Sequence, residues 1–498
     1  MKNKKGSFNH KKEPFALLDL SLMNDKKNIF GIIAFTVMIL VYLFFNRYEK
    51  EYTQSPYSKE PFLINNFQTA EDCSTCHPQH YLEWSSSMHA YAFKDPVFFA
   101  MNSKEQDYHK NKGEDLGQFC IACHSPIAYV TNFIPQPDEL TFANSKKLPT
   151  QVKDGVSCSF CHVTIHNSET PNVLTKKSMF NVVKYHLDPG NTMYGSIKDP
   201  LPNSFHASKY NKNFSTSESC LPCHNLFVDG KNAEITFSEW ESSKYKTSNF
   251  PCQECHMETY EGFAVDPKLF PKAKKRYNLH RHFFAGIDEA RTAFPHKDLQ
   301  RDEIKRLLQQ TANININDLS IIAEQNTINF EVEVFNRAGH NIPSGATFAR
   351  ELWLDIKVIS ANDTIYQTGF VNENNQLYDF SIDPNNEIDP DLVIFRTVFY
   401  DEKGVSGIYK TSAQRMTKKS DYTIPTFESF RKNYRINTPD SSDSDFKIIA
   451  KLKFRARSPG FIDHLGLKGQ VPYSDTFIVD EKIVQFNSGG LLSVVSDE

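Results

Sequence analysis

The segment EDCSTCHPQHYLEWSSSMHAYAF, residues 71–93, decides how this chain is organised. It places Cys73 and Cys76 three positions apart, with His77 directly after them and His89 twelve residues further on. The same C-x-x-C-H spelling occurs four more times, and no cysteine lies outside the five copies. The other copies are Cys120-Ile-Ala-Cys123-His124, Cys158-Ser-Phe-Cys161-His162, Cys220-Leu-Pro-Cys223-His224 and Cys252-Gln-Glu-Cys255-His256.

Two thiols at this spacing serve several kinds of site. Zinc knuckles, thioredoxin-like redox sites and small disulfide-stapled folds all use such pairs, but none of them needs a histidine directly after the second cysteine. With 17 histidines in 498 residues, a histidine follows a given cysteine by chance roughly one time in thirty. Five occurrences out of five are therefore not accidental.

Covalent attachment of haem c does need that histidine. Two thioether bonds fix one edge of the porphyrin to the backbone, and the adjacent imidazole is delivered to the iron as the proximal ligand. The sequence therefore predicts five covalently bound haem c groups, held by all ten cysteines. His77, His124, His162, His224 and His256 are the predicted proximal iron ligands. The haems themselves then supply much of the core between residues 70 and 290.

Length and charge bound the remaining possibilities. A chain of 498 residues with 39% hydrophobic content is long enough for two or three domains with real cores. The formal net charge of -4 gives no reason to expect a nucleic-acid surface.

The N-terminus combines a basic flank with an apolar run. Seven lysines outnumber three acidic residues in residues 1–27, and the run 29–45 follows. As a helix this run is roughly 26 Å long, the short end of what crosses a bilayer. No A-x-A-like cleavage site follows it, which argues against a signal peptide, and a buried soluble helix would leave the lysines unexplained. We expect an uncleaved anchor with the N-terminus in the cytoplasm and the rest of the chain in the periplasm.

Eleven histidines beyond the anchor lie outside the motifs, and five suffice as distal iron ligands. His89 and His206 are both followed by alanine and preceded by small or apolar residues, and His280 and His282 stand before two phenylalanines and a glycine. His340 lies in a tight loop, from which it could reach back to a haem from another domain. His109, His166 and His186 have fewer such features, and His80, His296 and His464 read as ordinary polar residues. The candidate distal ligands are therefore His89, His206, His282, His340 and His280.

The spacing between His77 and His89 limits which iron His89 serves. If residues 77–90 form one helix, the two histidines lie roughly 18 Å apart along its axis. Axial nitrogens on one iron are only a few ångströms apart. We therefore expect His89 to ligate a neighbouring haem, unless the helix breaks at the three serines 85–87.

At this point the motifs resemble a known family. The first motif with its following Trp, Ser and His-Ala pattern, together with GVSCSFCH and CQECHM, is similar to the cytochrome c554-like multihaem cytochromes over residues 67–360. The resemblance implies distal roles for His89 and His206 and closely stacked haems; some relatives leave one iron five-coordinate. The pentahaem nitrite reductases are similar only in haem number, because their catalytic haem has lysine where all five motifs here have histidine.

The C-terminal third has a different pattern. Residues 328–336, 352–358 and 446–456 alternate between apolar and polar side chains, with turn residues between the runs, which predicts a β-sandwich. The segments FNRAGHNIPSG, residues 335–345, and RELWLDIKV, residues 350–358, are similar to a β-rich domain fused to many such cytochromes. We find no catalytic triad, phosphate loop or metal cluster here, so a packing or docking role is expected, apart from His340.

The predicted fold is an α+β multidomain chain with an N-terminal transmembrane helix, a mainly helical or irregular pentahaem domain and a C-terminal β-sandwich. Its predicted parts are a cytoplasmic tail (1–27), an anchor (28–46), a linker (47–66), the pentahaem domain (67–298), a connecting helix (299–312) and the sandwich (313–498).

Two functions remain open at the level of sequence. In the first, the chain carries electrons between a donor and a redox partner protein by hopping between bis-histidine haems. In the second, one iron lacks a distal ligand and acts on a small nitrogen or sulfur compound, with a neighbouring acid or base. A count of histidines does not decide between them, because it does not say which histidine reaches which iron.

Overall fold

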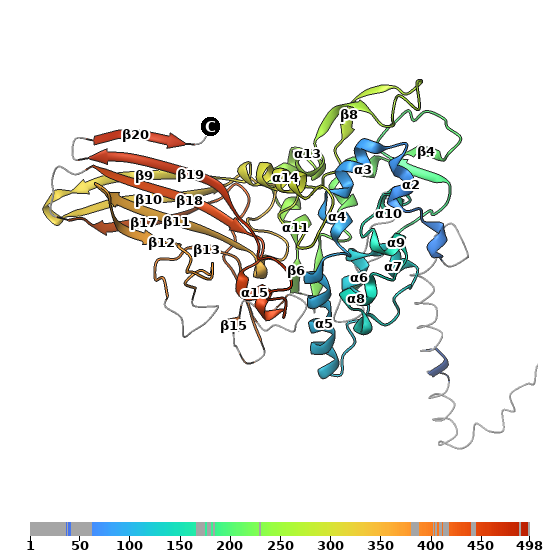
Figure 1. The fold of residues 1–498 in the computed structure, drawn as a ribbon, viewed down its shortest axis with the longest axis horizontal. Helices are drawn as coiled ribbons and strands as arrows, with labels where there is room; N and C mark the ends of the chain where they lie inside the picture. The colour runs from blue at the N-terminus through green and yellow to red at the C-terminus, as the bar shows by residue number, and fades with distance from the viewer. Residues whose placement is uncertain are drawn as a thin grey trace, which may run out of the picture. The chain divides into compact units, whose positions relative to one another are not determined.

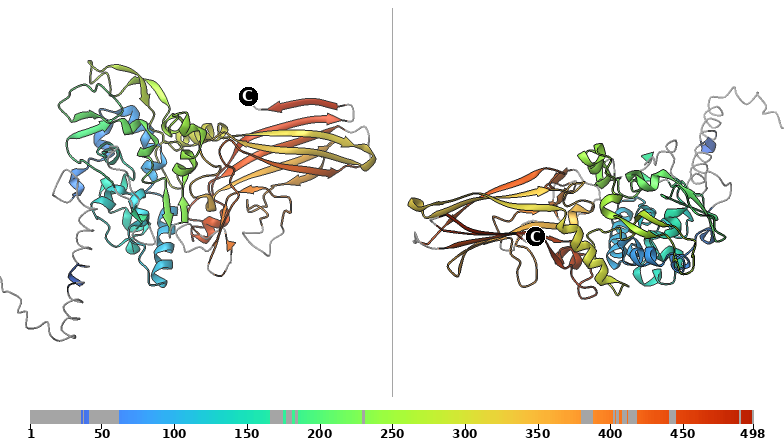
Figure 2. Two further views of the ribbon diagram at one scale, coloured as in Figure 1. Left: turned by 180° about the vertical axis from the view of Figure 1, so that it is seen from behind. Right: turned by 90° about the horizontal axis from the view of Figure 1, so that it is seen from above.

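The fold is described from a computed structural model. It describes residues 36, 38–40, 62–165, 175–176, 181–182, 185–228, 231–379, 388–401, 403, 406–407, 411, 418–439, 445–487 and 490–496. Residues 55–498 form one unit, separate from residues 1–54, and Figures 1 and 2 show its arrangement.

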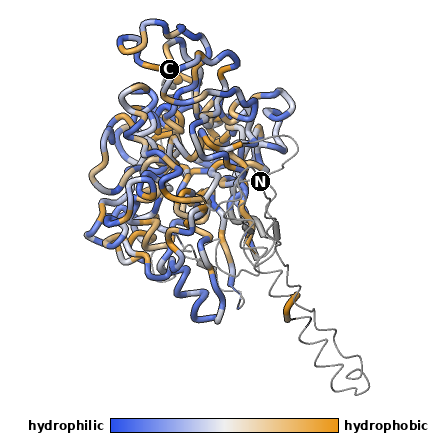
Figure 3. The backbone as a smooth tube through the Cα atoms, turned by 90° about the vertical axis from the view of Figure 1, so that its right-hand side faces the viewer, coloured by the Kyte–Doolittle hydropathy of each residue, from blue (hydrophilic) through white to orange (hydrophobic). Residues whose placement is uncertain are grey.

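Most of the predicted anchor, 28–46, lies outside the described residues, as do the predicted tail, 1–27, and most of the linker, 47–66. Within the described part of the chain, no helix is long and apolar enough to span a bilayer. Of the anchor, Thr36 and residues 38–40 are described as helical, and Met38, Ile39 and Leu40 are exposed. Figure 3 shows this short stretch coloured as hydrophobic.

The region of the five motifs is built from short helices. Only α5 and α14 are longer than eight residues, and α14 coincides with most of the predicted connecting helix. Three motifs form a helix whose last residue is the motif histidine, namely α6, α10 and α13. The helices are α2 (Ala70–Ser74), α3 (Pro78–Ser85), α4 (Met88–Tyr91), α5 (Pro96–Asn111), α6 (Phe119–His124), α7 (Pro126–Val130), α8 (Phe142–Ser145), α9 (Thr150–Lys153), α10 (Cys158–His162), α11 (Thr236–Glu241), α12 (Lys244–Thr247), α13 (Gln253–His256) and α14 (Lys297–Gln309).

Four two-stranded pairs complete this region. The pair of β3 and β4 is parallel, whereas the other three are antiparallel. Their strands are β1 (Thr175–Lys176), β2 (Asn181–Val182), β3 (Thr192–Gly195), β4 (Ala207–Tyr210), β5 (Leu226–Val228), β6 (Lys231–Glu234), β7 (Thr259–Phe263) and β8 (Lys275–His280).

The C-terminal region is β-rich, as predicted. One sheet has the order β17-β10-β9 and a second has the order β12-β11-β18-β19-β20, with β13 paired to β11. The same region also contains a small sheet, β15-β14-β16, and the helix α15 (Pro459–His464). The strands are β9 (Ala312–Ile322), β10 (Thr327–Asn336), β11 (Glu351–Ser360), β12 (Asp363–Thr368), β13 (Ile394–Phe395), β14 (Thr397–Tyr400), β15 (Ser406–Gly407), β16 (Lys418–Asp421), β17 (Ser429–Asn437), β18 (Phe446–Arg455), β19 (Thr476–Asn487) and β20 (Gly490–Ser496).

The alternating residues form the core between these sheets. Val332 of β10, Leu354 of β11 and Leu452 of β18 are fully buried and belong to one hydrophobic cluster that draws on both sheets. Burying one face of each strand explains why the period-two pattern was visible in the sequence. Figure 1 shows the long strands side by side, and Figure 2 shows the same layers from behind and from above.

The loop after β10 joins the β-rich region to the motif region. The Tyr245 hydroxyl donates to the Arg337 carbonyl at 2.9 Å, and the Ser344 hydroxyl donates to Glu239 Oε2 at 2.6 Å. The Asn336 amide donates to the His340 carbonyl at 2.9 Å and fixes the bend that follows the strand. These bonds hold His340 against α11 and α12.

Candidate haem site

All five motifs open into one cavity of about 1920 Å³. It is lined by all ten cysteines, by the five motif histidines and by six further histidines. The six are His80, His89, His206, His280, His282 and His340, which include every predicted distal ligand. None of the ten cysteines forms a disulfide, so each thiol is free for a thioether bond. The residues therefore fit covalently attached porphyrins better than the disulfide alternative, and no cluster of three potential zinc donors occurs among the described residues.

The histidine side chains that line the cavity are held in the neutral form, which is the form that binds a metal. A histidine ligand must be neutral, and its second ring nitrogen usually donates to a carbonyl that fixes the tautomer. Burial lowers the pKa of His77 and of His162, and it lowers the pKa of His256 to about 4. The Nδ1 atoms of these three rings donate to the carbonyls of residues 264, 194 and 285, each at 2.6 Å.

Three pairs of rings have the separation expected across one iron. An imidazole nitrogen binds a first-row metal at roughly 2.0 Å, so two rings on opposite faces of one ion have centroids roughly 6 Å apart. The centroids of His77 and His206 are 6.3 Å apart, and those of His162 and His282 are 6.4 Å apart. His256 and His340 are 6.3 Å apart, with ring planes inclined by 18°. In the structure, His206, His282 and His340 therefore lie opposite the histidines of the first, third and fifth motifs.

A fourth pair, His89 and His224, is indicated by the residues that surround His89 and not by a ring-to-ring distance. The His89 side chain is half-buried, and desolvation together with the neighbouring His224 and His256 lowers its pKa to about 3. Because His256 faces His340, His224 of the fourth motif is left for His89. His89 Nδ1 is buried without a hydrogen-bond partner among the described residues, and Phe284 packs on the ring at 4.5 Å.

The expectation of one continuous helix through residues 77–90 is wrong. α3 ends at Ser85, and Ser87 starts α4 by accepting a hydrogen bond from the Ala90 amide at 3.3 Å. Serine hydroxyls compete with the helical ladder for backbone groups, which explains the break. His89 nonetheless lies near the fourth and fifth motifs rather than beside His77, so a neighbouring haem remains its predicted partner.

Gly155 shows how closely α4 approaches the third motif. The Val156 amide donates to the His89 carbonyl at 3.0 Å, and a Cβ atom on Gly155 would lie 2.4 Å from that oxygen. Gly155 also has φ +65°, a conformation that favours glycine. The glycine before the third motif therefore sets the position of His89.

His124 of the second motif has no imidazole facing it among the described histidines; His166 lies outside the described residues. Its Nδ1 donates to the Ala92 carbonyl at 3.1 Å, and Phe98 stacks on its ring with centroids 4.3 Å apart. Arg457 and Asp288 are close enough to influence its pKa, which burial lowers. The second motif thus differs from the other four because no described imidazole lies opposite its histidine.

Two further histidines behave differently from the prediction. His280 lines the cavity, but its ring faces no motif histidine in the described structure, and its Nδ1 donates to the Met257 carbonyl at 2.8 Å. His80, expected to be an ordinary polar residue, is half-buried, and desolvation lowers its pKa to about 4. Its ring centroid is 6.2 Å from that of His77, yet its Nε2 is within 3.1 Å of the Tyr260 hydroxyl. That hydrogen bond occupies the nitrogen that an iron would need. The position of His80, three residues after His77, was the signal in the sequence that could have placed it near the first motif.

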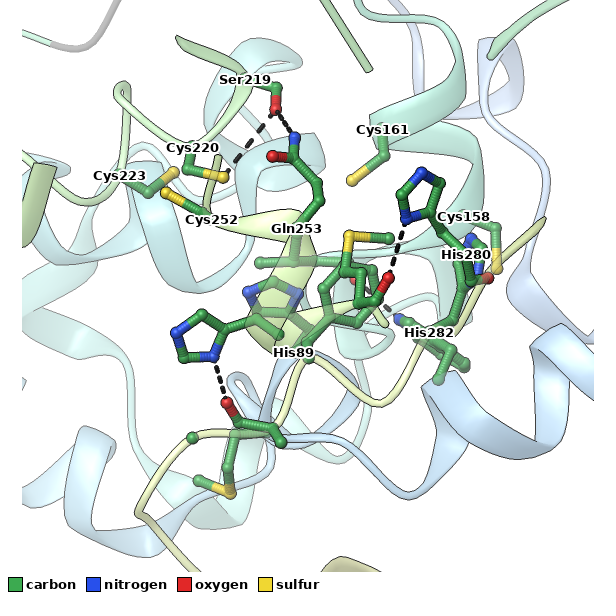
Figure 4. A pocket seen from close by; sticks show the side chains of 18 of the residues that line it. His89, Cys158, Cys161, Ser219, Cys220, Cys223, Cys252, Gln253, His280 and His282 are labelled. Carbon is green, nitrogen blue, oxygen red and sulfur yellow. Dashed lines mark hydrogen bonds between the residues drawn. The ribbon is translucent and has the colours of Figure 1, made fainter. Parts of the chain in front are cut away.

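Cysteines of different motifs lie next to one another. The thiols of Cys73 and Cys158, of Cys123 and Cys223, and of Cys220 and Cys252 are close enough to shift each other's pKa. Figure 4 shows Cys220, Cys223 and Cys252 gathered on one side of the cavity, and Cys158 and Cys161 on the other beside His280 and His282. The cysteine pairs of the first and third, second and fourth, and fourth and fifth motifs are therefore adjacent.

Two comparisons with known proteins found a similarity. Residues 72–163, which contain the first three motifs, match the family model described as cytochrome c554 and c-prime. This region is cytochrome c554-like. The fold is similar to the crystal structure of a penta-heme cytochrome c552 from Thermochromatium tepidum, with a TM-score of 0.57 and 18% identity over 84% of this chain and 99% of that chain. No curated protein sequence is significantly similar to the chain. The predicted resemblance to cytochrome c554-like multihaem cytochromes is confirmed by these two matches, and the C-x-x-C-H motifs are consistent with covalently bound haem c.

Proposed function

We propose that this cytochrome carries five covalently bound haem c groups and transfers electrons through them between a donor and a redox partner protein. The observation that carries the proposal is the single cavity into which all ten cysteines and all five motif histidines project. Haem c supplies the one-electron chemistry of its iron. The chain's own residues hold the irons in neutral imidazole pairs and keep the five attachment edges close together.

The order of transfer follows from the neighbouring thiols. Cys73 lies next to Cys158, the charge of Cys223 helps to raise the pKa of its neighbour Cys161, and Cys223 lies next to Cys123. Cys220 of the fourth motif meets Cys252 of the fifth. These contacts favour a route from the first group to the third and the fourth, which then borders both the second and the fifth. We also propose that the haems along this route are closely stacked.

Haem content and spin state test the proposal together. The pyridine haemochrome assay should give five haems per chain, and low-temperature EPR of the oxidised protein should show at least four low-spin irons. A potentiometric titration should then resolve stepwise one-electron reduction of all five. Fewer than five haems, or a mixture of high-spin irons throughout, would contradict the paired-imidazole arrangement.

We further propose that residues 28–46 anchor the protein in the cytoplasmic membrane, with the N-terminus in the cytoplasm and the haem and β-sandwich domains in the periplasm. The basic flank, the apolar run and the exposed side chains of Met38, Ile39 and Leu40 support this. Removal of residues 1–46 behind a cleavable signal peptide should yield a fully haem-loaded protein that is released from membranes by an alkaline carbonate wash. Retention of that variant in the membrane fraction would contradict the proposed anchor.

A second function is favoured by one observation, the lack of an imidazole facing His124 in the described structure. An open iron there would allow the cytochrome to act on a small anion such as nitrite or a sulfur oxyanion. Arg350 and Arg457 line the cavity and share Asp288, with Arg350 Nη1 to Asp288 Oδ1 at 2.6 Å. The Nε atoms of both arginines are buried and have no hydrogen-bond partner among the described residues, so they can donate to an anion.

Spin state separates the two functions. One high-spin iron per chain, lost on addition of nitrite or hydroxylamine, would support the second function. Five low-spin irons would support electron transfer alone. Because His166 is not described, the variant His166→Ala decides whether it closes the site: a new high-spin iron in the variant would show that it does.

A further inference from the structure

The chain's exposed face beside the first motif is formed by two segments that are far apart in sequence. Residues 196–212 run from the end of β3 through β4, and residues 261–277 form the end of β7, the connecting loop and the start of β8. Asp199 accepts hydrogen bonds from Lys274 at 3.1 Å and from Arg276, which joins the two segments. Figure 1 shows the β4 loop and the β8 hairpin at the same end of the motif region. We call this surface the basic face.

Both segments also hold the first motif. The His77 Nδ1 donates to the Ala264 carbonyl at 2.6 Å, and the Asp266 amide donates to the Cys76 carbonyl at 2.9 Å. The other segment supplies His206, whose ring lies 6.3 Å from that of His77. The basic face is therefore the surface that covers the first haem site.

Large apolar side chains are exposed at its centre. Phe205 is 62% exposed, Leu269 is 54% exposed and Tyr277 is 78% exposed. Phe205 also meets Phe270 with ring centroids 5.8 Å apart, so apolar groups of the two segments adjoin. Apolar surface of this kind, bordered by charged residues, is typical of a site that binds another protein.

The border is strongly basic. The two segments contain eight lysines or arginines and three acidic residues, a net charge of +5 in a chain whose net charge is -4. Among the described residues, the ammonium groups of Lys198, Lys212, Lys268 and Lys272 pair with no carboxylate, and all four are exposed. Unpaired charge of one sign steers an oppositely charged protein to its docking site.

We propose that the basic face is the docking site of a soluble, acidic redox protein that exchanges electrons with the haem held by Cys73, Cys76 and His77. In the exchange one electron leaves the partner's reduced cofactor, and one ferric iron becomes ferrous; no atom is transferred. This inference rests on the proposed electron-transfer function. It goes further by naming the end of the route and the charge of the protein that meets it.

The test measures the reduction of the oxidised holoprotein by an acidic flavodoxin in its hydroquinone state. The second-order rate constant should fall steeply as ionic strength rises, and Lys268→Glu combined with Lys272→Glu should lower it by at least ~10-fold at low salt and flatten its salt dependence. The matched control combines Lys147→Glu with Lys305→Glu, two exposed lysines outside the basic face, and should leave the rate nearly unchanged. The variant Tyr277→Ser should lower the rate at high salt, where the apolar contact dominates.

Reduction by dithionite separates this inference from the proposed function. If dithionite reduces all five irons in the parent and in both double variants, but the flavodoxin rates do not differ, the docking site is overturned and electron transfer stands. If dithionite reduces fewer than five irons in the parent, the proposed function itself fails. Unchanged flavodoxin rates together with a loss of binding to phosphatidylglycerol-containing vesicles would overturn the protein partner in favour of a membrane surface.

Discussion

His256 and His340 face each other with ring centroids 6.3 Å apart, although they lie in different parts of the chain. His256 ends α13, whereas His340 belongs to the loop that follows β10 of the β-rich region. Removing the β-rich region would therefore remove the imidazole that faces His256 as well as a packing surface. The connection explains why a β-rich region accompanies the five motifs.

The variant His340→Ala should add one high-spin iron per chain to the EPR spectrum of the parent, because His256 would lose the imidazole opposite it. Haem content should remain unchanged, since no cysteine is affected. Exogenous imidazole should restore the low-spin signal. His464→Ala is the control, because His464 is exposed at the end of α15 and does not line the cavity. An unchanged spectrum of His340→Ala would exclude His340 as a ligand.

His280 and His282 offer a matched pair within three residues. His282 lies 6.4 Å from His162 and burial places its pKa well below the usual value, whereas His280 faces no motif histidine among the described residues. His282→Ala should therefore convert one iron to high spin, and His280→Ala should leave all irons as they are in the parent. EPR and the optical charge-transfer band of high-spin iron measure both. If His280→Ala produced the high-spin iron and His282→Ala did not, His280 and not His282 would be the ligand.

The substitution Gly155→Ala should disturb the fourth haem rather than the third. Its Cβ atom would lie 2.4 Å from the His89 carbonyl, and the backbone has a positive φ. α4 would have to shift, carrying His89 away from His224, so the variant should show a high-spin signal for one iron. Gly190→Ala is the control, because nothing lies within 4 Å of its Cβ position. Identical spectra for the two variants would show that α4 is free to adjust.

The attachment motifs and the strands could be predicted because their signals are local. Each C-x-x-C-H copy lies within five residues, and Phe330, Val332 and Val334 alternate along one strand and are all buried. The iron pairing could not be predicted in full, because it depends on contacts between distant segments. His340 reaches His256 only through the loop that Tyr245 and Glu239 hold in place.

The missed features have physical causes as well. The break between α3 and α4 comes from the Ser87 hydroxyl, whose bond to the Ala90 amide competes with a continuous helix. His80 was expected to be an ordinary polar residue, yet the pairing of β7 and β8 brings the Tyr260 hydroxyl to its Nε2. The lack of a described imidazole opposite His124 could be recognised only after the structure had shown which histidines face the other motifs.

Glu351→Gln should destabilise the β-rich region. Glu351 of β11 and Arg455 of β18 are 2% and 0% exposed as side chains, and Arg455 Nε donates to Glu351 Oε2 at 2.6 Å. Removing one charge of a buried pair leaves the other uncompensated and costs about 3–5 kcal/mol. Denaturant unfolding followed by tryptophan fluorescence would report it, since Arg455 lies over the Trp353 ring at 5.5 Å.

The exposed pair of Glu333 and Arg431 provides the control for that experiment. Arg431 is 59% exposed, and its Nη2 donates to Glu333 Oε1 at 2.7 Å. Solvent screens such a pair, so Glu333→Gln should change the free energy of unfolding far less than Glu351→Gln. Equal losses for the two variants would show that burial does not govern the strength of these pairs.

Asp95 should make stability depend on pH near neutrality. It starts α5 by accepting a hydrogen bond from the Val97 amide at 3.0 Å. Burial, reinforced by Asp288, raises its pKa from 3.8 to about 6, although the Val97 amide, Arg457 and Arg291 act in the opposite direction. Between pH 4 and 6 the folded protein thus binds a proton that the unfolded chain has released.

The contribution of Asp95 to the free energy of unfolding should therefore be fully present below pH 4 and be lost as pH rises through about 6. Asp95→Asn keeps the acceptor for the Val97 amide but cannot ionise. The variant should match the parent at pH 4 and exceed its stability at pH 7.5 by no more than about 3 kcal/mol, the value of the pKa shift. Denaturant unfolding at the two pH values measures the difference. A stability difference that is the same at both pH values would mean that Asp95 ionises normally in the folded protein.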